Sequence, residues 1–249
     1  LAGENGEDAP EPGPGAEKLA ARFGWTYPHQ ASVDMPSKLT ATQLKGREKD
    51  TEVSEEAEAL SPQRTVRTLR RPIFEKERPL TPTERGTALH LAMQYLDYAR
   101  TDTEEDIREE VARLVSGQFI TPAQGAAVDT AAIRALFASP LGRKLRTAPQ
   151  VEREFKFSLL VPAKDYFPQA EAGEEVLLQG VVDCWFDGPE GITVLDFKSD
   201  RVRPGGEAAR GEEYRPQLEA YSRALERITG RRVAHRILWF FATGTGLEL

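Results

Sequence analysis

The sequence is poor in cysteine: its 249 residues contain only Cys184. A single cysteine excludes an internal disulfide, a four-cysteine zinc site and a cysteine-ligated iron–sulfur cluster. Because its neighbours are apolar, we expect Cys184 to be a buried structural thiol in a reducing compartment. The sequence also lacks a signal peptide, an apolar run of membrane-spanning length and a G-x-x-x-x-G-K-[ST] phosphate loop. These absences predict a cytoplasmic protein with no membrane partner and no nucleotide site in this sequence.

The chain also lacks an excess of positive charge, because 40 acidic residues outnumber 33 basic ones and give a net charge of −7. A protein that binds nucleic acid by itself usually presents a basic surface. Either the substrate is not nucleic acid, or a partner domain holds the strand and this chain needs only a local basic lip. Four arginines could form such a lip, or could be ordinary solvated residues: Arg201, Arg203, Arg210 and Arg215.

Composition divides the chain into three parts. Residues 1–22 are rich in Gly, Pro and Glu and predict a disordered linker. Residues 23–80 form an N-terminal extension whose densely charged stretch, at about 46–71, predicts a mobile loop. Residues 81–249 carry the periodic patterns of a folded core. Because the sequence starts at Leu1 and not at a methionine, we expect it to be a piece of a longer protein.

Hydrophobic periodicity in the core changes from helical to alternating along the chain. Helices are predicted at residues 84–99 and 104–116, and capping residues predict further helix starts at Thr121, Asp129 and Ser139. Alternation then predicts a strand at residues 151–161 and a hairpin at 176–198. After the hairpin we expect a polar loop at 207–213, a helix at 216–229 and a closing strand at 233–241. This order predicts an α/β fold with a mixed central sheet flanked by helices.

The predicted hairpin concentrates charge in apolar strands. Side chains of a strand alternate between faces, so Asp196 and Lys198 share one face. If Asp187 pairs with Ile192, Asp183 falls opposite Asp196, with Cβ atoms about 4.5–5.5 Å apart. A slip of one residue would turn Asp183 to the other face.

Two carboxylates that meet in this way repel one another unless a cation lies between them. Magnesium prefers oxygen ligands, and the ammonium of Lys198 could approach an attacking water or a charged phosphate. The alternative is an exposed ladder of ion pairs, which the cost of charge in apolar strands disfavours. Glu154, on the polar face of its strand, is either a further acidic ligand or solvated, and we favour the solvated role. His90 taken alone is more often structural than a ligand.

The order of these motifs resembles the PD-(D/E)xK nucleases of the RecB-like branch, which have a restriction-endonuclease-like core. The order is Gly86-x-x-x-His90 on a helix, Glu154 on a strand, a hairpin with the three charged residues, and Gln217-x-x-x-Tyr221 on a helix. More narrowly, five stretches are similar to the C-terminal nuclease domain of bacterial AddA-type helicase–nuclease subunits: RGTALHLAMQYLD, EREFKFSLLVPA, LLQGVVDCWFDG, VLDFKSDRV and YRPQLEAYSRALERITG. One departure is Val182 before the first aspartate, where the family motif has proline.

The resemblance implies roles for particular residues. Catalysis would depend on Asp183, Asp196 and Lys198, with Lys198 assisting the attacking water. A magnesium ion, which manganese could replace, would be bound by His90, Asp183, Asp196 and the backbone carbonyl of Phe197. Gln217 and Tyr221 match the Q-x-x-x-Y motif, which orients the site and contacts the DNA strand.

The resemblance also implies a function. It is magnesium-dependent exonuclease or endonuclease cleavage of single DNA strands, delivered by helicase domains of the same full-length protein. That protein would act with an AddB-type partner in double-strand-break repair by homologous recombination. Two alternatives remain: a catalytically inactive nuclease fold that guides DNA or docks a partner, and an unrelated metal or acid–base enzyme acting on a small substrate. The intact charged residues of the hairpin argue against the inactive module.

Overall fold

A computed structural model describes residues 15, 18, 22–25, 27, 30–33, 35–45, 80–199 and 202–249. The chain divides into two compact units, one formed by residues 1–37 and 161–176 and the other by residues 38–160 and 177–249. The mobile loop predicted at 46–71, and most of the linker predicted at 1–22, lie outside the described residues.

The smaller unit contains little regular structure among its described residues. It includes the short helix α2 (Gln30–Val33) and the 3-10 turn η3 (Ala163–Asp165). Ser32 donates a hydrogen bond to the carboxylate of Glu174, which joins the two segments of this unit. All the candidate site residues belong to the larger unit.

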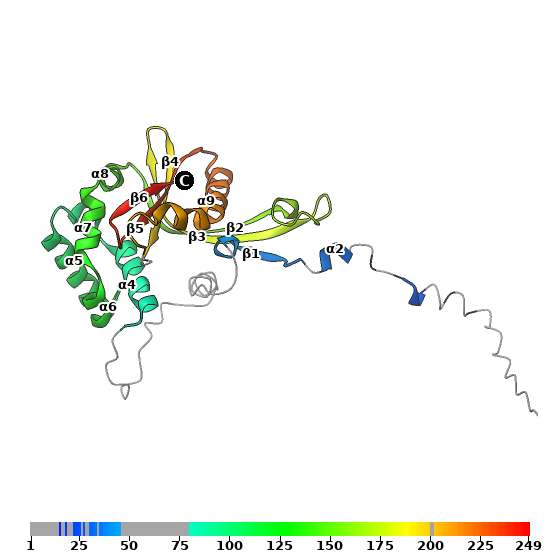
Figure 1. The fold of residues 1–249 in the computed structure, drawn as a ribbon, viewed down its shortest axis with the longest axis horizontal. Coiled ribbons are helices and arrows are strands. Elements are labelled where there is room, and N and C mark those ends of the chain that lie inside the picture. Colours follow the sequence, from blue (N-terminus) through cyan, green and yellow to red (C-terminus); the bar gives the residue numbers. More distant parts are fainter. Residues whose placement is uncertain are drawn as a thin grey trace, which may run out of the picture. The chain divides into compact units, whose positions relative to one another are not determined.

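The described residues form one sheet of six strands, in the order β1-β3-β4-β5-β6, with β2 also paired to β3 (Figure 1). Pairs β1–β3 and β4–β5 are parallel, whereas β3–β4 and β5–β6 are antiparallel, so the sheet is mixed, as predicted. The strands are β1 (Lys38–Thr40), β2 (Val151–Pro162), β3 (Glu175–Gly188), β4 (Gly191–Lys198), β5 (Val233–Phe240) and β6 (Thr245–Glu248). The sequence patterns did not reveal β1 or β6.

The β3–β4 hairpin has the predicted register, because Asp187 pairs with Ile192. Its turn is tighter than expected, since Gly188 and Gly191 also pair. Gly191 adopts a φ of 134°, which favours glycine, and a Cβ there would lie 2.6 Å from the carbonyl oxygen of Arg232. A glycine at this position therefore allows the turn to close against the start of β5.

Helices α4 to α8 follow one another in sequence and gather on one side of the sheet, whereas α9 lies apart from this group of helices (Figure 1). Their bounds are α4 (Pro82–Tyr95), α5 (Glu104–Ser116), α6 (Pro122–Ala127), α7 (Thr130–Ala138), α8 (Pro140–Thr147) and α9 (Glu207–Thr229), with 3-10 turns η1 (Ala41–Lys45) and η2 (Tyr98–Arg100). The predicted starts are confirmed, because Thr121, Asp129 and Ser139 are the N-caps of α6, α7 and α8.

The polar loop predicted at residues 207–213 is wrong, because α9 begins at Glu207 and runs through Pro216. A proline inside a helix removes a hydrogen bond and usually ends the helix. Tertiary packing overrides that preference here. Gly211 lies so close to β6 that a Cβ would come within 2.2 Å of Leu247, and Tyr214 is fully buried. Few apolar side chains mark this buried face, so the sequence resembles a loop.

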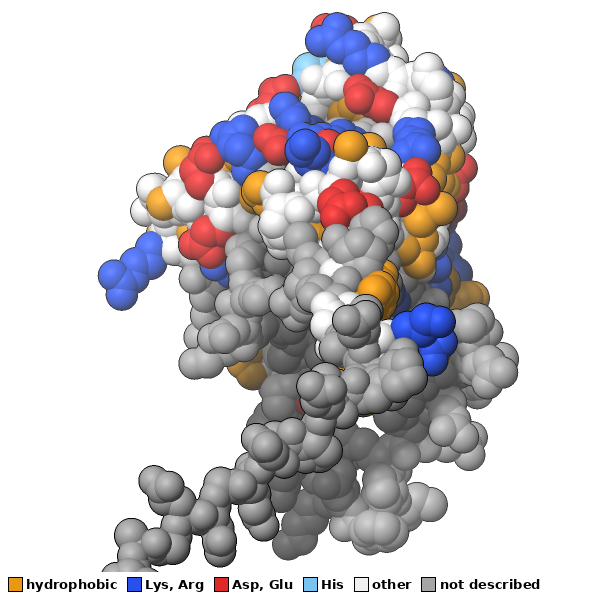
Figure 2. Space-filling view, turned by 90° about the vertical axis from the view of Figure 1, so that its right-hand side faces the viewer, with side chains coloured by type: hydrophobic (Ala, Val, Ile, Leu, Met, Phe, Trp, Pro, Cys, Tyr) orange, Lys and Arg blue, Asp and Glu red, His pale blue; other side chains and the backbone are white. Residues whose placement is uncertain are grey.

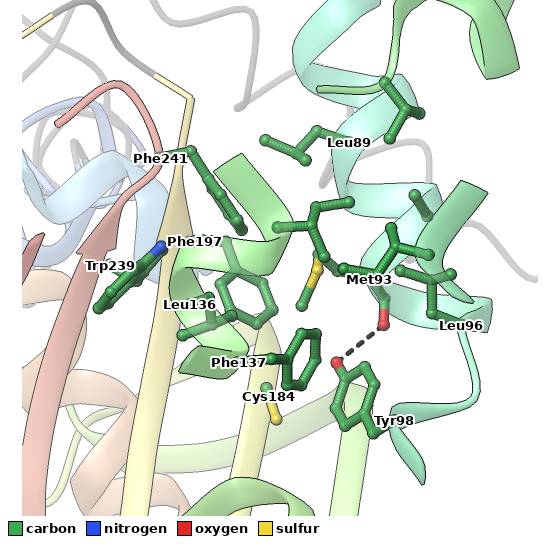
Figure 3. Packing of buried hydrophobic residues seen from close by; sticks show 14 of the residues in the cluster. Leu89, Met93, Leu96, Tyr98, Leu136, Phe137, Cys184, Phe197, Trp239 and Phe241 are labelled. Atoms are coloured by element: carbon green, nitrogen blue, oxygen red, sulfur yellow. Dashed lines mark hydrogen bonds between the residues drawn. The ribbon is translucent and has the colours of Figure 1, made fainter. Parts of the chain in front are cut away.

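The core lies on both faces of the sheet. Helices α4, α5 and α7 pack on the face that carries Cys184, Leu195 and Phe197. Figure 3 shows part of this cluster, with Met93 of α4 and Phe137 of α7 near Cys184 and Phe197. On the other face, Tyr214 of α9 packs in a second cluster with Phe240 of β5. Cys184 is free and buried, as predicted, and burial raises the pKa of its thiol. Alternation along β4 therefore directs the residues between these apolar positions, Asp196 and Lys198, away from the first cluster.

Charges of both signs are interspersed over the described surface that Figure 2 shows. This mixture agrees with a chain whose net charge is only moderately acidic. None of the described helices combines the length and the apolar character that a membrane span requires.

Candidate active site

Three side chains from separate elements converge in the larger unit: His90 of α4, Glu154 of β2 and Asp183 of β3. One ligand atom from each lies within 4.8 Å of the other two, and all three residues are half-buried. The Nδ1 atom of His90 is 3.6 Å from Oδ1 of Asp183. Three segments spread over more than 90 residues of the sequence thus supply one set of possible metal ligands.

Helix α4 presents His90 from a well-defined start. Thr81 accepts a hydrogen bond from the amide of Glu84, the Glu84 side chain accepts one from the amide of Thr81, and Pro82 occupies the first turn. One helical turn before His90, Gly86 faces the end of β4, where a Cβ would lie 2.8 Å from Oγ of Ser199. The small residue lets α4 approach the strand that carries the charged pair.

The hairpin backbone fixes the carboxylate of Asp183. The last recorded cross-strand pair is Cys184 with Leu195, one position before Asp183 would meet Asp196. At that point the amide of Phe197 donates a hydrogen bond of 2.7 Å to Oδ2 of Asp183. The other oxygen, Oδ1, faces His90.

Glu154 reaches this site through an unusual backbone conformation, with a φ of 50°. Non-glycine residues rarely adopt this left-handed region, and outliers of this kind concentrate at functional sites. Around Glu154 the strand loses its alternation, since residues 151–155 are all half-buried, whereas alternation is regular from Lys156. We expected Glu154 to be solvated, and the structure instead groups it with His90 and Asp183.

The carboxylates make the site attractive to positive charge. Burial of His90 opposes its protonation, but the negative charge of Asp183, with a smaller contribution from Glu154, outweighs burial and raises the pKa of His90 to about 9. A site that stabilises an imidazolium in this way has the electrostatics of a cation site.

Asp196 and Lys198 form a buried ion pair on β4, with 2.8 Å between Oδ2 and Nζ. The ammonium also lies 4.0 Å from the centre of the Tyr214 ring. Asp196 is outside the group formed by His90, Glu154 and Asp183. The structure thus separates two of the predicted ligands, because Asp183 belongs to the group with His90 and Glu154 whereas Asp196 pairs with Lys198. Phe197, whose carbonyl is another predicted ligand, directs its amide toward Asp183.

Gln217 and Tyr221 contact each other on α9, as their spacing predicts. Nε2 of Gln217 donates a hydrogen bond of 2.7 Å to the Tyr221 hydroxyl, and both residues are buried. The Tyr221 ring makes an edge contact with Phe157 of β2. Oε1 of Gln217 has no hydrogen-bond partner among the described residues. Because Gln217 and Tyr221 are buried, an orienting role is favoured over direct contact with a DNA strand.

Two of the four arginines considered as a basic lip have acidic neighbours. Arg210 pairs with Glu213 and donates to the Tyr214 hydroxyl at 3.0 Å, and Arg215 pairs with Glu212 on the helix surface. Arg201 lies outside the described residues.

An imidazole and two carboxylates suit a hard or borderline divalent cation such as magnesium or manganese. Adjacent ligands of an octahedral ion are about 3 Å apart when each bond is about 2.1 Å. The observed 3.6 Å between His90 and Asp183 is close to that spacing. The residues therefore fit such an ion, which His90, Glu154 and Asp183 could hold.

Comparisons with known proteins show the family of this chain. The chain is 38% identical over 239 residues to AddA, a subunit of the ATP-dependent helicase/nuclease, from Acetivibrio thermocellus, covering 94% of this chain and 19% of that protein. For the same-named proteins of Desulforudis audaxviator and Pelotomaculum thermopropionicum, identity is 39% and 40%, over 95% and 93% of this chain and 20% and 19% of theirs. The chain thus spans about a fifth of these relatives. A sequence model of the PD-(D/E)XK nuclease superfamily matches residues 41–246, and this chain therefore belongs to that superfamily.

Proposed function

We propose that this domain is a magnesium-dependent deoxyribonuclease that hydrolyses phosphodiester bonds. The observation that carries the proposal is the convergence of His90, Glu154 and Asp183, with their ligand atoms within 4.8 Å of one another. Membership of a nuclease superfamily supports the reaction class. Manganese would substitute for magnesium, because both ions accept carboxylate ligands in octahedral geometry.

A bound divalent cation would polarise the phosphate and lower the pKa of an attacking water. The protein residues then have separate tasks. Lys198, held between the carboxylate of Asp196 and the ring of Tyr214, would donate a hydrogen bond to the attacking water or to a phosphate oxygen. Asp196 would fix the ammonium, and its second oxygen and the Phe197 carbonyl are further proposed ligands. The hydrogen bond from Gln217 would fix the Tyr221 side chain, and the edge contact of Tyr221 with Phe157 would hold α9 against β2, the strand that carries Glu154.

The proposed substrate is a single DNA strand delivered by helicase domains of the same full-length protein. Each relative is named as a subunit of an ATP-dependent helicase/nuclease. This chain covers only 19% or 20% of the length of those relatives, which agrees with helicase domains elsewhere in the same protein. A net charge of −7 agrees with a nuclease that receives its strand from another domain. We further propose that the full-length protein has an AddB-type partner and a role in double-strand-break repair by homologous recombination.

Digestion of labelled single-stranded DNA with magnesium tests the proposal. We expect cleavage that EDTA abolishes and that Asp196→Ala abolishes without unfolding the domain. Asp187→Ala is the matched control, because Asp187 lies at the far end of the same hairpin, paired with Arg231. Full activity of Asp196→Ala would contradict the assignment of the site. Absence of cleavage by the wild type, also within a full-length helicase–nuclease, would favour an inactive module.

A further inference from the structure

The C-terminal end of α4, the helix that carries His90, is held by residues from other elements. The last carbonyl groups of a helix have no partners within it, and basic residues in the last turn often satisfy them. Helix α4 has no basic residue in its last turn. Among the described residues, two distant arginines bind this end instead. Arg113 of α5 donates to the carbonyl of Tyr95 at 3.0 Å, and Arg153 of β2 donates to that of Leu96 at 2.7 Å.

Arg153 is fixed more firmly than one hydrogen bond requires. Its guanidinium lies 4.7 Å from the centre of the Tyr98 ring, and the same nitrogen approaches the carbonyl of Met93 at 3.4 Å. Tyr98 itself donates to that carbonyl at 2.8 Å, as the dashed line in Figure 3 shows. Burial raises the pKa of Tyr98 well above its usual range, so its hydroxyl remains a donor. Arg153, Tyr98 and the end of α4 form one connected unit.

Arg153 directly precedes Glu154, whose left-handed backbone aims it at the candidate metal site. A conformation of this kind persists only when its surroundings determine it strongly. The bonds of Arg153 to α4 supply such a constraint on one side of Glu154. His90 lies one helical turn before Met93 on α4. The same contact therefore connects the backbone that presents Glu154 with the helix that presents His90.

We propose that Arg153 is a positioning residue that sets the spacing of the metal ligands His90 and Glu154. The inference rests on the proposed metal site and adds to it a residue that touches neither metal nor substrate. Residues that orient metal ligands typically contribute 10–100-fold to metal affinity. Arg153 reaches both carbonyls with one nitrogen while its planar guanidinium lies over the Tyr98 ring, and a lysine lacks the planar group that makes this combination.

Arg113 provides a matched control, because it binds the same end of α4 and also the carboxylate of Glu110. It belongs to α5, which carries none of the three grouped ligands. Arg113→Lys should therefore destabilise the helix end without changing the spacing of the ligands. Arg153→Lys should do both.

Calorimetric titration of DNA-free protein with Mn²⁺ separates these effects. We expect Arg153→Lys to raise the Mn²⁺ dissociation constant by about 10-fold or more, and Arg153→Gln by at least as much. Arg113→Lys should keep the wild-type constant, while thermal unfolding without metal shifts to lower temperature in the Arg113 and Arg153 variants. Cleavage by Arg153→Lys should return toward the wild-type rate at saturating Mn²⁺.

Wild-type Mn²⁺ affinity in Arg153→Lys would overturn the proposal. So would an equal loss of affinity in Arg113→Lys, because that result would make the effect one of general stability. If the wild type itself bound no Mn²⁺, the proposed metal site would fail, and the inference with it.

Discussion

Replacing Asp183 with asparagine tests the electrostatics of the site with little change in shape. The amide oxygen of asparagine can still accept the hydrogen bond from the Phe197 amide, which measures 2.7 Å, so the hairpin should keep its geometry. What disappears is the negative charge that lies 3.6 Å from His90. At that distance, with an effective dielectric constant of about 20, two unit charges interact by about 4.6 kcal/mol.

That energy corresponds to roughly three powers of ten in affinity or rate. Water reduces it, because the side chain of His90 is 28% exposed. A divalent cation would carry twice the charge of the imidazolium but would lose hydration on binding. We therefore expect Asp183→Asn to weaken Mn²⁺ binding and to slow DNA cleavage by about 100-fold to 1000-fold.

Initial rates on a fluorescent single-stranded oligonucleotide, over a range of Mg²⁺ concentrations, measure this loss. Asp187→Asn is the control, since it makes the same substitution four residues along the same strand, where Asp187 pairs with Arg231. We expect the control to cleave at the wild-type rate. Equal rates for the wild type and Asp183→Asn would refute the reasoning, as would an equal loss in Asp187→Asn.

Three further predictions concern other residues. Glu154→Gln should weaken Mn²⁺ binding at least 10-fold in calorimetry, whereas Glu152→Gln on the same strand should not. Tyr214→Phe, which keeps the ring facing Lys198, should cleave DNA like the wild type, while Tyr214→Leu should lower kcat several-fold with little change in KM. Burial of Glu110 opposes its ionisation, but hydrogen bonds from Arg113 and from the Asp97 amide outweigh burial and hold its pKa below the usual range. Glu110→Gln should therefore lower the free energy of unfolding by about 2 kcal/mol at neutral pH.

The pH dependence of Glu110→Gln follows from the direction of that shift. A depressed carboxyl pKa stabilises the fold above its unfolded value of about 4.3, and this stability is lost as the pH falls through the folded value. In urea titrations, the difference between wild type and variant should shrink below about pH 4.3. A constant difference would contradict the assignment. Equal Mn²⁺ affinities of Glu154→Gln and Glu152→Gln would contradict the prediction for Glu154, and loss of activity in Tyr214→Phe would contradict the prediction for Tyr214.

Local patterns in the sequence predicted much of the fold because short-range chemistry determines those features. Capping residues marked the starts of α6, α7 and α8, and hairpin logic gave the pairing of Asp187 with Ile192. In that register the amide of Phe197, which lies between Asp196 and Lys198 in sequence, donates a hydrogen bond to the Asp183 carboxylate.

The features that the sequence did not reveal depend on tertiary contacts. The left-handed φ of Glu154 has no sequence signal, because glycine or asparagine usually marks such a position. Its distance from His90 depends on the packing of β2 against α4, including the contact of Arg153 with Leu96. Similarly, the burial of Gly211 against Leu247 extends α9 through a segment whose composition resembles a loop.

The most direct test of the central claim is to locate the ion itself. Anomalous diffraction from crystals of the domain soaked in Mn²⁺ would show its position without any assumption about activity. We predict a peak between Nδ1 of His90, the carboxylate of Glu154 and Oδ1 of Asp183, near Lys198. Manganese bound elsewhere, with none contacting these three side chains, would contradict the proposed metal site.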